Sequence, residues 1–247
     1  MKLALITDIH ANREAFEACL DDAQRKGVDR YALLGDFVGY GADPHWVVER
    51  IRALVADGAI AIRGNHDEAV VQGPREGMNS DATHVINWTR SQLDDDQLTF
   101  LSRLPFAVER YNSLFAHANG YAPQAWEYVT SRSEALQSLH ATALPYTFAG
   151  HVHEPQLYNL SGLGKISSFT PTPGVGIPVP THRQWFVLPG SAGQPRDGNP
   201  AACWALFEPG QALLTFQRVP YDHDAAAAKI IAAGLPARLG ERLKVGH

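Results

Sequence analysis

The chain has 247 residues, of which 45% are hydrophobic, a size and composition typical of one globular domain with a sizeable core. Its formal net charge of −5 argues against general nucleic-acid binding, because such binding needs a basic surface. No apolar run approaches the ~20 residues of a membrane span, and the first residues resemble a strand more than a signal peptide. We therefore expect a cytoplasmic protein without membrane contact.

The first seventy residues alternate between short apolar runs and amphipathic stretches. Gly27 ends the first amphipathic stretch, while Asp43 and Pro44 begin the second as N-cap and first helical residue. Strands are expected at 2–7, 30–36 and 59–67, and helices at 12–27 and 43–58. Such alternation predicts a parallel sheet built from right-handed crossovers.

The rest of the chain changes character, although we expect residues 1–247 to form a single domain. We expect residues 74–104 to form a helical insert of two helices, the second capped near Asp94 or Asp95. Further on we expect a hairpin ending in His117, a helix near 130–141, strands at 146–153, 185–191, 202–208 and 212–219, and a helical tail at 222–243 broken at 234–236. The strands indicate a mixed or antiparallel second sheet, and the Pro- and Gly-rich segment 170–180 indicates a long loop.

Polar side chains of the kinds that bind metals recur where the expected strands end. They are Asp8 and His10, Asp36, Asn65 with His66 and Asp67, His117, and His151 with His153. In open α/β sheets ligand sites form at the carboxyl ends of strands, and the i, i+2 spacing places both side chains on one side of an extended segment. Each motif alone could be a helix cap or a buried histidine, but five in succession predict a shared metal site.

In this order, the motifs "DIH", "GDFVGYG", "GNHD", a single His and "GHVH" resemble those of the calcineurin-like metallophosphoesterase superfamily. The motifs extend from residue 8 to residue 153, and "LPGSAGQPRDG" and "VPYD" are similar to bacterial phosphodiesterase or phosphatase members. The resemblance implies a four-layer α/β sandwich, with two mixed β-sheets flanked by helices. It also implies a two-metal site at the sheet edge.

The resemblance further implies a role for each matching residue. The first metal would be bound by Asp8, His10 and His153, the second by Asn65, His117 and His151, and both by Asp36. His66 would stay off the metals and serve as general acid. We expect Asp67 to cap the next helix or to support the site from behind.

A phosphoesterase with this site would hydrolyse phosphomonoesters or phosphodiesters by attack of a metal-bridging hydroxide. Mixed His, Asp and Asn ligands suit two divalent ions of Mn or Fe, with Zn or Ni also possible, better than Ca, which prefers oxygen cages. Neutral Asn and His ligands leave the ions enough positive charge to attract a phosphate. The substrate would be a small-molecule phosphate ester or a nucleotide, and the sequence carries no signal for oligomeric state.

Substrate contacts are harder to read from the sequence. Asn12 either binds a phosphate oxygen or caps the first helix, and Arg13, Arg183 and Arg196 are either phosphate clamps or solvated surface residues. Phosphoprotein phosphatases carry an Arg in "GDxVDRG" where this chain has Tyr40, which weakens the alternative that the protein is a phosphoprotein phosphatase. Tyr40 either lines the pocket or packs under the next helix. A non-catalytic scaffold is the other alternative, but such relatives have lost ligands, and every expected ligand is present here.

Overall fold

The computed structural model describes residues 1–74 and 77–247, and residues 75 and 76 of the predicted helical insert lie outside that description. The first sheet has the order β3-β2-β1-β11-β12-β9, with β1 (Leu3–Ile6), β2 (Arg30–Leu33), β3 (Ile60–Ala61), β9 (Gly176–Pro178), β11 (Ala202–Glu208) and β12 (Leu213–Val219). The second has the order β4-β5-β6-β10-β7-β8, with β4 (Ala107–Arg110), β5 (Ser113–Ala116), β6 (Tyr146–Phe148), β7 (Pro155–Leu160), β8 (Ile166–Phe169) and β10 (Gln184–Pro189).

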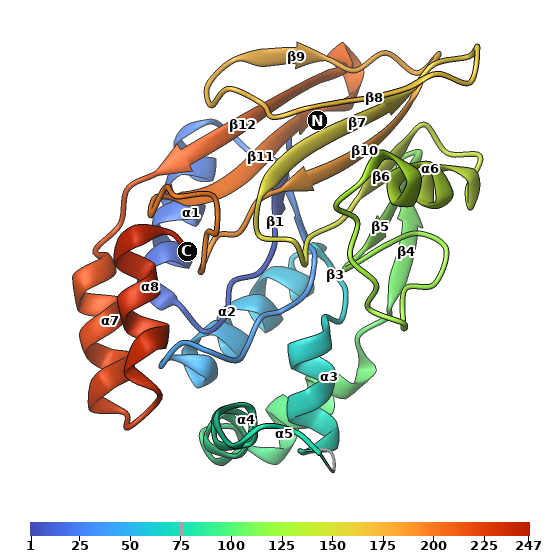
Figure 1. The fold of residues 1–247 in the computed structure, drawn as a ribbon. Coiled ribbons are helices and arrows are strands. Elements are labelled where there is room, and N and C mark those ends of the chain that lie inside the picture. The colour runs from blue at the N-terminus through green and yellow to red at the C-terminus, as the bar shows by residue number, and fades with distance from the viewer. Residues whose placement is uncertain (75–76) are drawn as a thin grey trace.

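Eight α-helices are present in the described residues. They are α1 (Arg13–Arg25), α2 (Pro44–Ala56), α3 (Asn65–Gln72), α4 (Ser80–Ser91), α5 (Asp95–Arg103), α6 (Arg132–His140), α7 (His223–Ala232) and α8 (Ala237–Val245). In Figure 1, α3, α4 and α5 gather at the lower end, while α7 and α8 lie side by side next to α1. The helices predicted within the insert are α4 and α5, and Asp94 caps α5 by accepting from Gln97 N.

Alternating side chains bind the layers together. In β1, Leu3 and Leu5 face a core cluster shared with the second sheet, whereas Ala4 and Ile6 face the cluster of α1 and α2. In β10, likewise, Trp185 and Val187 join the cluster between the sheets, and Phe186 and Leu188 pack with α6 residues such as Leu139. This period of two gives each strand a different partner on each face. The order of layers is therefore helices, sheet, sheet, helix, which confirms the four-layer α/β sandwich with two mixed sheets.

The strand expected at 59–67 is shorter than predicted, because β3 spans only Ile60–Ala61 and Asn65, His66 and Asp67 begin α3 instead. Three further details differ from the sequence-based expectation. First, β11 and β12 do not belong to the second sheet; β11 pairs antiparallel with β1 and completes the first one. Second, β7 and β8 extend the second sheet where no strand was predicted. Third, the segment 170–180 is not all loop, because Gly176–Pro178 forms β9, which pairs with β12 at the edge of the first sheet. An edge strand tolerates proline because one side of its backbone needs no partner.

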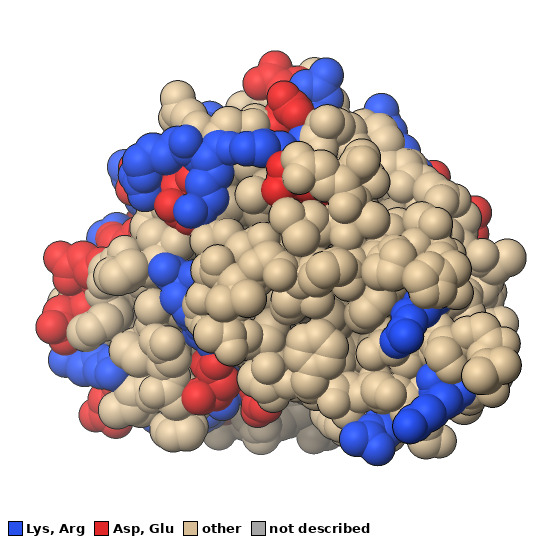
Figure 2. All heavy atoms as spheres, turned by 90° about the horizontal axis from the view of Figure 1, so that it is seen from above, with Lys and Arg blue, Asp and Glu red and all other residues tan. Residues whose placement is uncertain are grey.

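The surface shows no single charged strip on the face drawn in Figure 2. Lys and Arg form separate groups there, interspersed with Asp and Glu at the margins, and other residues fill the middle. Among the described residues, no helix combines the length and the apolar character needed to cross a membrane.

Candidate metal centre

The ends of five strands converge on one edge of the two sheets. β1 pairs in parallel with β2, β2 with β3, and β5 with β6, so their carboxyl ends point the same way. Backbone hydrogen bonds then tie the following loops together, from Asp8 N to Gly35 O (3.1 Å) and from Gly150 N to His117 O (2.7 Å). The predicted ligands Asp8, His10, Asp36, Asn65, His117, His151 and His153 all lie on these segments.

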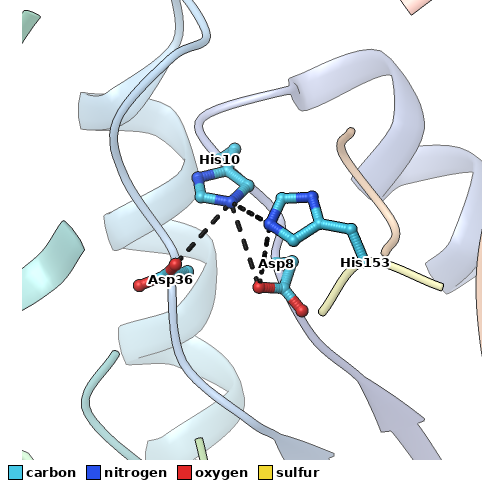
Figure 3. Close-up of side chains that lie close together, drawn as sticks. All are labelled: Asp8, His10, Asp36 and His153. Carbon is cyan, nitrogen blue, oxygen red and sulfur yellow. Dashed lines mark hydrogen bonds and ion pairs between the residues drawn. The ribbon is translucent and has the colours of Figure 1, made fainter. Parts of the chain in front are cut away.

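One group of possible ligands contains Asp8, His10, Asp36 and His153, all of which are buried. His153 Nε2 lies 3.3 Å from Asp8 Oδ1 and 3.1 Å from His10 Nε2. His10 Nε2 also lies 3.7 Å from Asp36 Oδ2, and Figure 3 shows these nitrogen and oxygen atoms turned toward a common point. The candidate ligand atoms all lie within 4.8 Å of one another, as expected for side chains around one cation.

A second group contains Asp36, His117 and His151, with Asn65 beside it. His117 Nε2 lies 3.3 Å from Asp36 Oδ2 and 3.1 Å from the side-chain oxygen of Asn65. Asp36 is thus the one residue common to both groups, and the same carboxylate oxygen, Oδ2, approaches His10 on one side and His117 on the other.

Backbone carbonyl groups orient the histidines. The Nδ1 atoms of His10, His117 and His153 lie 3.3, 2.7 and 2.7 Å from carbonyl oxygens. Because a carbonyl only accepts, Nδ1 carries the proton and Nε2 is left as the ligand atom. His151 is reversed, since its Nε2 lies 3.0 Å from the Trp126 carbonyl and Nδ1 is left for the cluster.

The carboxylates are fixed in the same way. Asp8 Oδ2 accepts from the Thr7 hydroxyl (2.8 Å) and from His151 N (3.0 Å), which also donates to Oδ1 (3.2 Å), and Oδ1 is directed toward His153. Asp36 Oδ1 accepts from the backbone N–H of His66 (2.8 Å), which leaves Oδ2 toward both histidine groups. Asp8 Oδ1 and Asp36 Oδ2 are therefore directed before any cation binds.

This arrangement strains the backbone. Positive φ angles between 49° and 70° occur at five of the seven predicted ligands: Asp8, His10, Asp36, His151 and His153. Such a conformation costs a non-glycine residue on the order of 1–3 kcal/mol and persists where the surroundings enforce it. Here the interstrand hydrogen bonds and the buried carboxylates enforce it. Strain concentrated on these residues marks the edge as a functional site.

The buried carboxylates and imidazoles shift one another's pKa values. Burial by itself raises the pKa of Asp36, but the imidazoles of His117 and His66 outweigh burial and hold this pKa well below its usual range. Burial also opposes protonation of His117, yet the Asp36 charge raises its pKa to about 9. Burial raises the pKa of Asp8 to about 7 and lowers that of His151 to about 4. A proton on His117 thus occupies the place where a metal ion would compensate Asp36.

The donor set fits divalent metal ions. Four neutral imidazoles, two carboxylates and one amide oxygen form a mixed nitrogen and oxygen set of the kind that binds first-row transition metals. A site for Ca would instead be built almost wholly of oxygen. By their chemistry the clusters are therefore candidate binding sites for divalent metal ions.

His66 stands apart from the ligands although it neighbours Asn65 in sequence. Its ring lies 4.9 Å from the ring of His10 and 4.4 Å from that of Tyr40, measured between centroids. His66 and Tyr40 both line a cavity of about 350 Å³, and Tyr40 also packs against the apolar cluster of α4, α7 and α8, so contact of Tyr40 with substrate stays a prediction.

Asp67 lies behind the site. Within the described residues, its side chain makes no hydrogen bond to the side chain of a predicted ligand. Its carboxylate accepts from Gly64 N (2.9 Å) as part of the capping box of α3, and from Phe37 N (2.8 Å) and Val38 N (3.2 Å). It therefore joins the start of α3 to the loop that carries Asp36, which combines both predicted roles.

The predicted substrate contacts divide. Asn12 is buried and caps α1 by accepting from Ala15 N, while its amide donates to Gly193 O (2.8 Å). Its polar atoms are therefore engaged within the protein, which favours the helix-cap alternative. Burial is the main cause that lowers the pKa of His10, His66 and His153, and the positive charge of Arg196 lowers it further. Arg196 therefore lies close to the site.

Two predicted arginines lie elsewhere. Arg13 pairs with Glu17 (3.1 Å) and stacks its guanidinium on the Trp46 ring. Arg183 is exposed and donates to Asn159, near the end of β7 that is farther from the site. At about 3.3 Å per residue, this end lies roughly 15 Å from the start of β7. The phosphate-clamp reading of both residues is thus unsupported, because their positions match the surface alternative.

Several residues at the site were not predicted. Tyr128 stacks on His151 with ring centroids 4.0 Å apart, and the Trp126 carbonyl orients His151. Gln194 and Arg242 lie on the other side, with Arg242 lining the cavity next to His66. No motif marks Tyr128, Trp126 or Arg242, because each comes from a loop or helix that only folding brings to the edge; Gln194 lies within "LPGSAGQPRDG", but nothing in that segment singles it out.

Comparison with known proteins agrees with this geometry. The family model of the calcineurin-like phosphoesterase superfamily domain matches residues 1–211. An uncharacterised protein of Methanocaldococcus jannaschii is 33% identical over 255 residues, covering 99% of this chain and 98% of the relative.

Solved structures are similar over the whole chain. A metallophosphoesterase from Sphaerobacter thermophilus has 35% identity and a TM-score of 0.89, covering 100% of this chain and 99% of the other. A hypothetical protein from Pyrococcus horikoshii has a TM-score of 0.80 and covers 100% and 98%, but at 18% identity the likeness concerns the fold alone.

Proposed function

The chain belongs to the calcineurin-like phosphoesterase superfamily, and on this basis we propose that it hydrolyses phosphomonoesters or phosphodiesters with two divalent metal ions. The observation that carries the proposal is the position of Asp36 Oδ2 between His10 and His117, at 3.7 and 3.3 Å from their Nε2 atoms. A carboxylate oxygen shared between two ligand groups suits a bridge between two ions.

Seven side chains would bind these ions. Asp8, His10 and His153 would hold the first, Asn65, His117 and His151 the second, and Asp36 both. When bound, a pair of divalent ions lowers the pKa of water and neutralises phosphoryl oxygens, which is the chemistry that phosphate ester hydrolysis needs. Mn or Fe would suit the donor set, and Zn or Ni are alternatives.

His66 would donate the proton that the leaving-group oxygen requires. Its backbone N–H bonds Asp36 Oδ1, so the ring is held beside the candidate ligands without belonging to them. Burial lowers the pKa of His66, and an incoming phosphate anion opposes this shift, so the ring gains its proton as substrate binds. Proton donation of this kind contributes ~10²–10⁴ in rate.

The cavity favours a small substrate. Its volume of about 350 Å³ suits a small-molecule phosphate ester or a nucleotide, and Tyr40 replaces the arginine by which phosphoprotein phosphatases grip phosphate. The scaffold alternative is disfavoured because every candidate ligand lies at the same edge with its ligand atom directed inward.

Metal reconstitution would test the proposal. We would strip metals with a chelator, add Mn, Fe, Zn or Ni singly, count ions per chain by mass spectrometry, and assay p-nitrophenyl phosphate and bis(p-nitrophenyl) phosphate. We expect two ions per chain, metal-dependent hydrolysis, and at least about a thousandfold loss in Asp36→Asn.

The exposed Asp57, at the end of α2, provides the control, since Asp57→Asn makes the same chemical change away from the site. A single ion per chain, or full turnover in Asp36→Asn, would contradict the proposal.

A further inference from the structure

The C-terminal helix α8 forms one wall of the cavity that His66 enters. Arg238 and Arg242 of α8 line this cavity together with Tyr40 and His66. The helix is held there by apolar contacts, because Leu239 and Leu243 share a core cluster with Val85 of α4. Helix α8 therefore positions Arg238 and Arg242 beside the candidate active site.

Two guanidinium groups converge on one neutral oxygen. Arg196 Nη2 donates to Gln194 Oε1 at 3.1 Å, and Arg242 Nη1 approaches the same oxygen at 3.3 Å. Gln194 is buried, and its backbone N–H bonds the Ser191 hydroxyl (2.8 Å), so this anchor is itself fixed. A loop after β10 and a helix at the chain end thus meet at one residue.

Neither Arg196 nor Arg242 has an acidic partner in the described residues. Arg196 Nε is buried there without any hydrogen-bond partner. Arg238, one turn before Arg242, shows the contrast, because it is neutralised by Asp81 through two bonds of 2.8 and 3.0 Å. Burial and the charge of Arg196 lower the pKa of Arg242, which reflects two cations held close together. Like charges kept in contact without a counter-ion indicate a place for an anion.

We propose that Arg196 and Arg242 bind a second phosphate group of the substrate, located on its leaving group. Two guanidiniums match the charge of a phosphate dianion and can each offer paired N–H donors. The location depends on the proposed function, because His66 lines the same cavity as Arg242, to which Gln194 joins Arg196, and would protonate the leaving group. The substrate class is then phosphate esters whose alcohol carries another phosphate, such as nucleoside bisphosphates.

Binding of inorganic phosphate to the metal-free protein tests the site without catalysis. Isothermal titration at pH 8 and low salt should show binding by the wild type and at least tenfold weaker binding by Arg242→Gln. Arg242→Lys, which keeps the charge, should recover part of the loss. Lys244→Gln provides the matched control, because Lys244 lies on the same helix but pairs with Asp224 at 3.0 Å.

Undetectable binding by the wild type would overturn the inference, as would equal weakening in Arg242→Gln and Lys244→Gln. Thermal unfolding of each variant would show whether the fold is kept, and Arg242→Lys gives the answer if Arg242→Gln fails to fold.

A substrate pair then separates the inference from the proposed function. With the metal-loaded enzyme, Arg242→Gln should lower kcat/KM for adenosine 3′,5′-bisphosphate at least tenfold more than for adenosine 5′-monophosphate. Equal losses on both substrates would contradict the second phosphate site. If the wild type released phosphate from neither compound and from no aryl phosphate, the proposed function would fail, while phosphate binding to the metal-free protein would still decide the inference.

Discussion

The ligand edge, made of the segments after β1, β2, β3, β5 and β6, differs sharply from the cavity wall formed by α4 and α8. At the edge, the candidate ligands Asp8, His117 and His153 are buried and bonded to backbone groups. In the wall, Met78 next to α4 is 36% exposed, and the Asp81–Arg238 ion pair is open to solvent. One region is rigid and strained, and the other is a packed surface with few polar constraints.

The difference teaches which part of the molecule sets chemistry and which sets selectivity. Ligands directed by carbonyl groups are pre-organised, so metal chemistry depends on the strand ends. The wall instead comes from two helices far apart in sequence, whose residues Val85 and Leu239 belong to one apolar cluster together with residues of α7. Substitutions in the wall can therefore change the substrate without disturbing the metal ligands.

His66→Ala should have the largest effect and would define the boundary between the two regions. The residue lies in a ligand segment, but its ring faces the cavity, so we expect both metals to stay bound. Hydrolysis should fall by ~10²–10⁴ for esters with poor leaving groups and less for p-nitrophenyl esters. Metal content and kcat measured over a leaving-group series would check this, and loss of a metal would show that His66 is a ligand.

Gly64→Ala should disturb the ligand edge by displacing Asp36. A Cβ at this position would collide with the backbone and carboxylate of Asp36. Displacing the shared carboxylate should weaken metal affinity by about 10–100-fold, the size seen when supports of metal ligands are lost. Chelator competition would measure it, with Gly162→Ala as the control, because a Cβ there meets no atom within 4 Å and, like Gly64, Gly162 has no positive φ. Unchanged metal affinity would contradict the close-packing argument.

Metal affinity should rise with pH, because ligands at the edge lose protons when a metal binds. The arginines of the wall keep their charge over the same pH range. The pKa of His117 is raised to about 9, so a metal must displace its proton below that pH. We expect affinity to increase about tenfold per pH unit between 7 and 9. Below pH 7 the slope should steepen, because Asp8, with its pKa raised to about 7, then also loses a proton on binding. Competition with a chelating dye would measure both slopes, and a flat response from 7 to 9 would exclude displacement of that proton.

Asp81→Asn should have the smallest effect. The ion pair with Arg238 is exposed, with relative exposures of 55% and 46% for Arg238 and Asp81. Exposed pairs contribute ~0.2–1 kcal/mol to the free energy of unfolding and less at high salt. Urea unfolding at two salt concentrations would check this, and a loss well above this range would mean that the wall is held electrostatically rather than by its apolar cluster.

The sequence alone determined the strand-end motifs and most elements of the fold. The apolar runs and helical spacing of residues 2–62 depend on local side-chain pattern, and so does the break in the tail at Gly234, Leu235 and Pro236. The same pattern missed β9, because Gly176 and Pro178 disfavour a strand and only the backbone of β12 supplies its partner. It also missed β7, whose pairing with β10 supplies what the local pattern does not show.

Tertiary structure alone decided which polar residues meet. The motifs named the candidate ligands, yet the convergence of Asp36 Oδ2 on His10 and His117 depends on loops from two different sheets. Arg242 carries no sequence signal at all, because an arginine on an amphipathic helix is ordinarily a solvated surface residue. The apolar packing of α8 against α7 and α4 brings it to Gln194, and packing between distant segments is a property of the folded chain rather than of any local pattern.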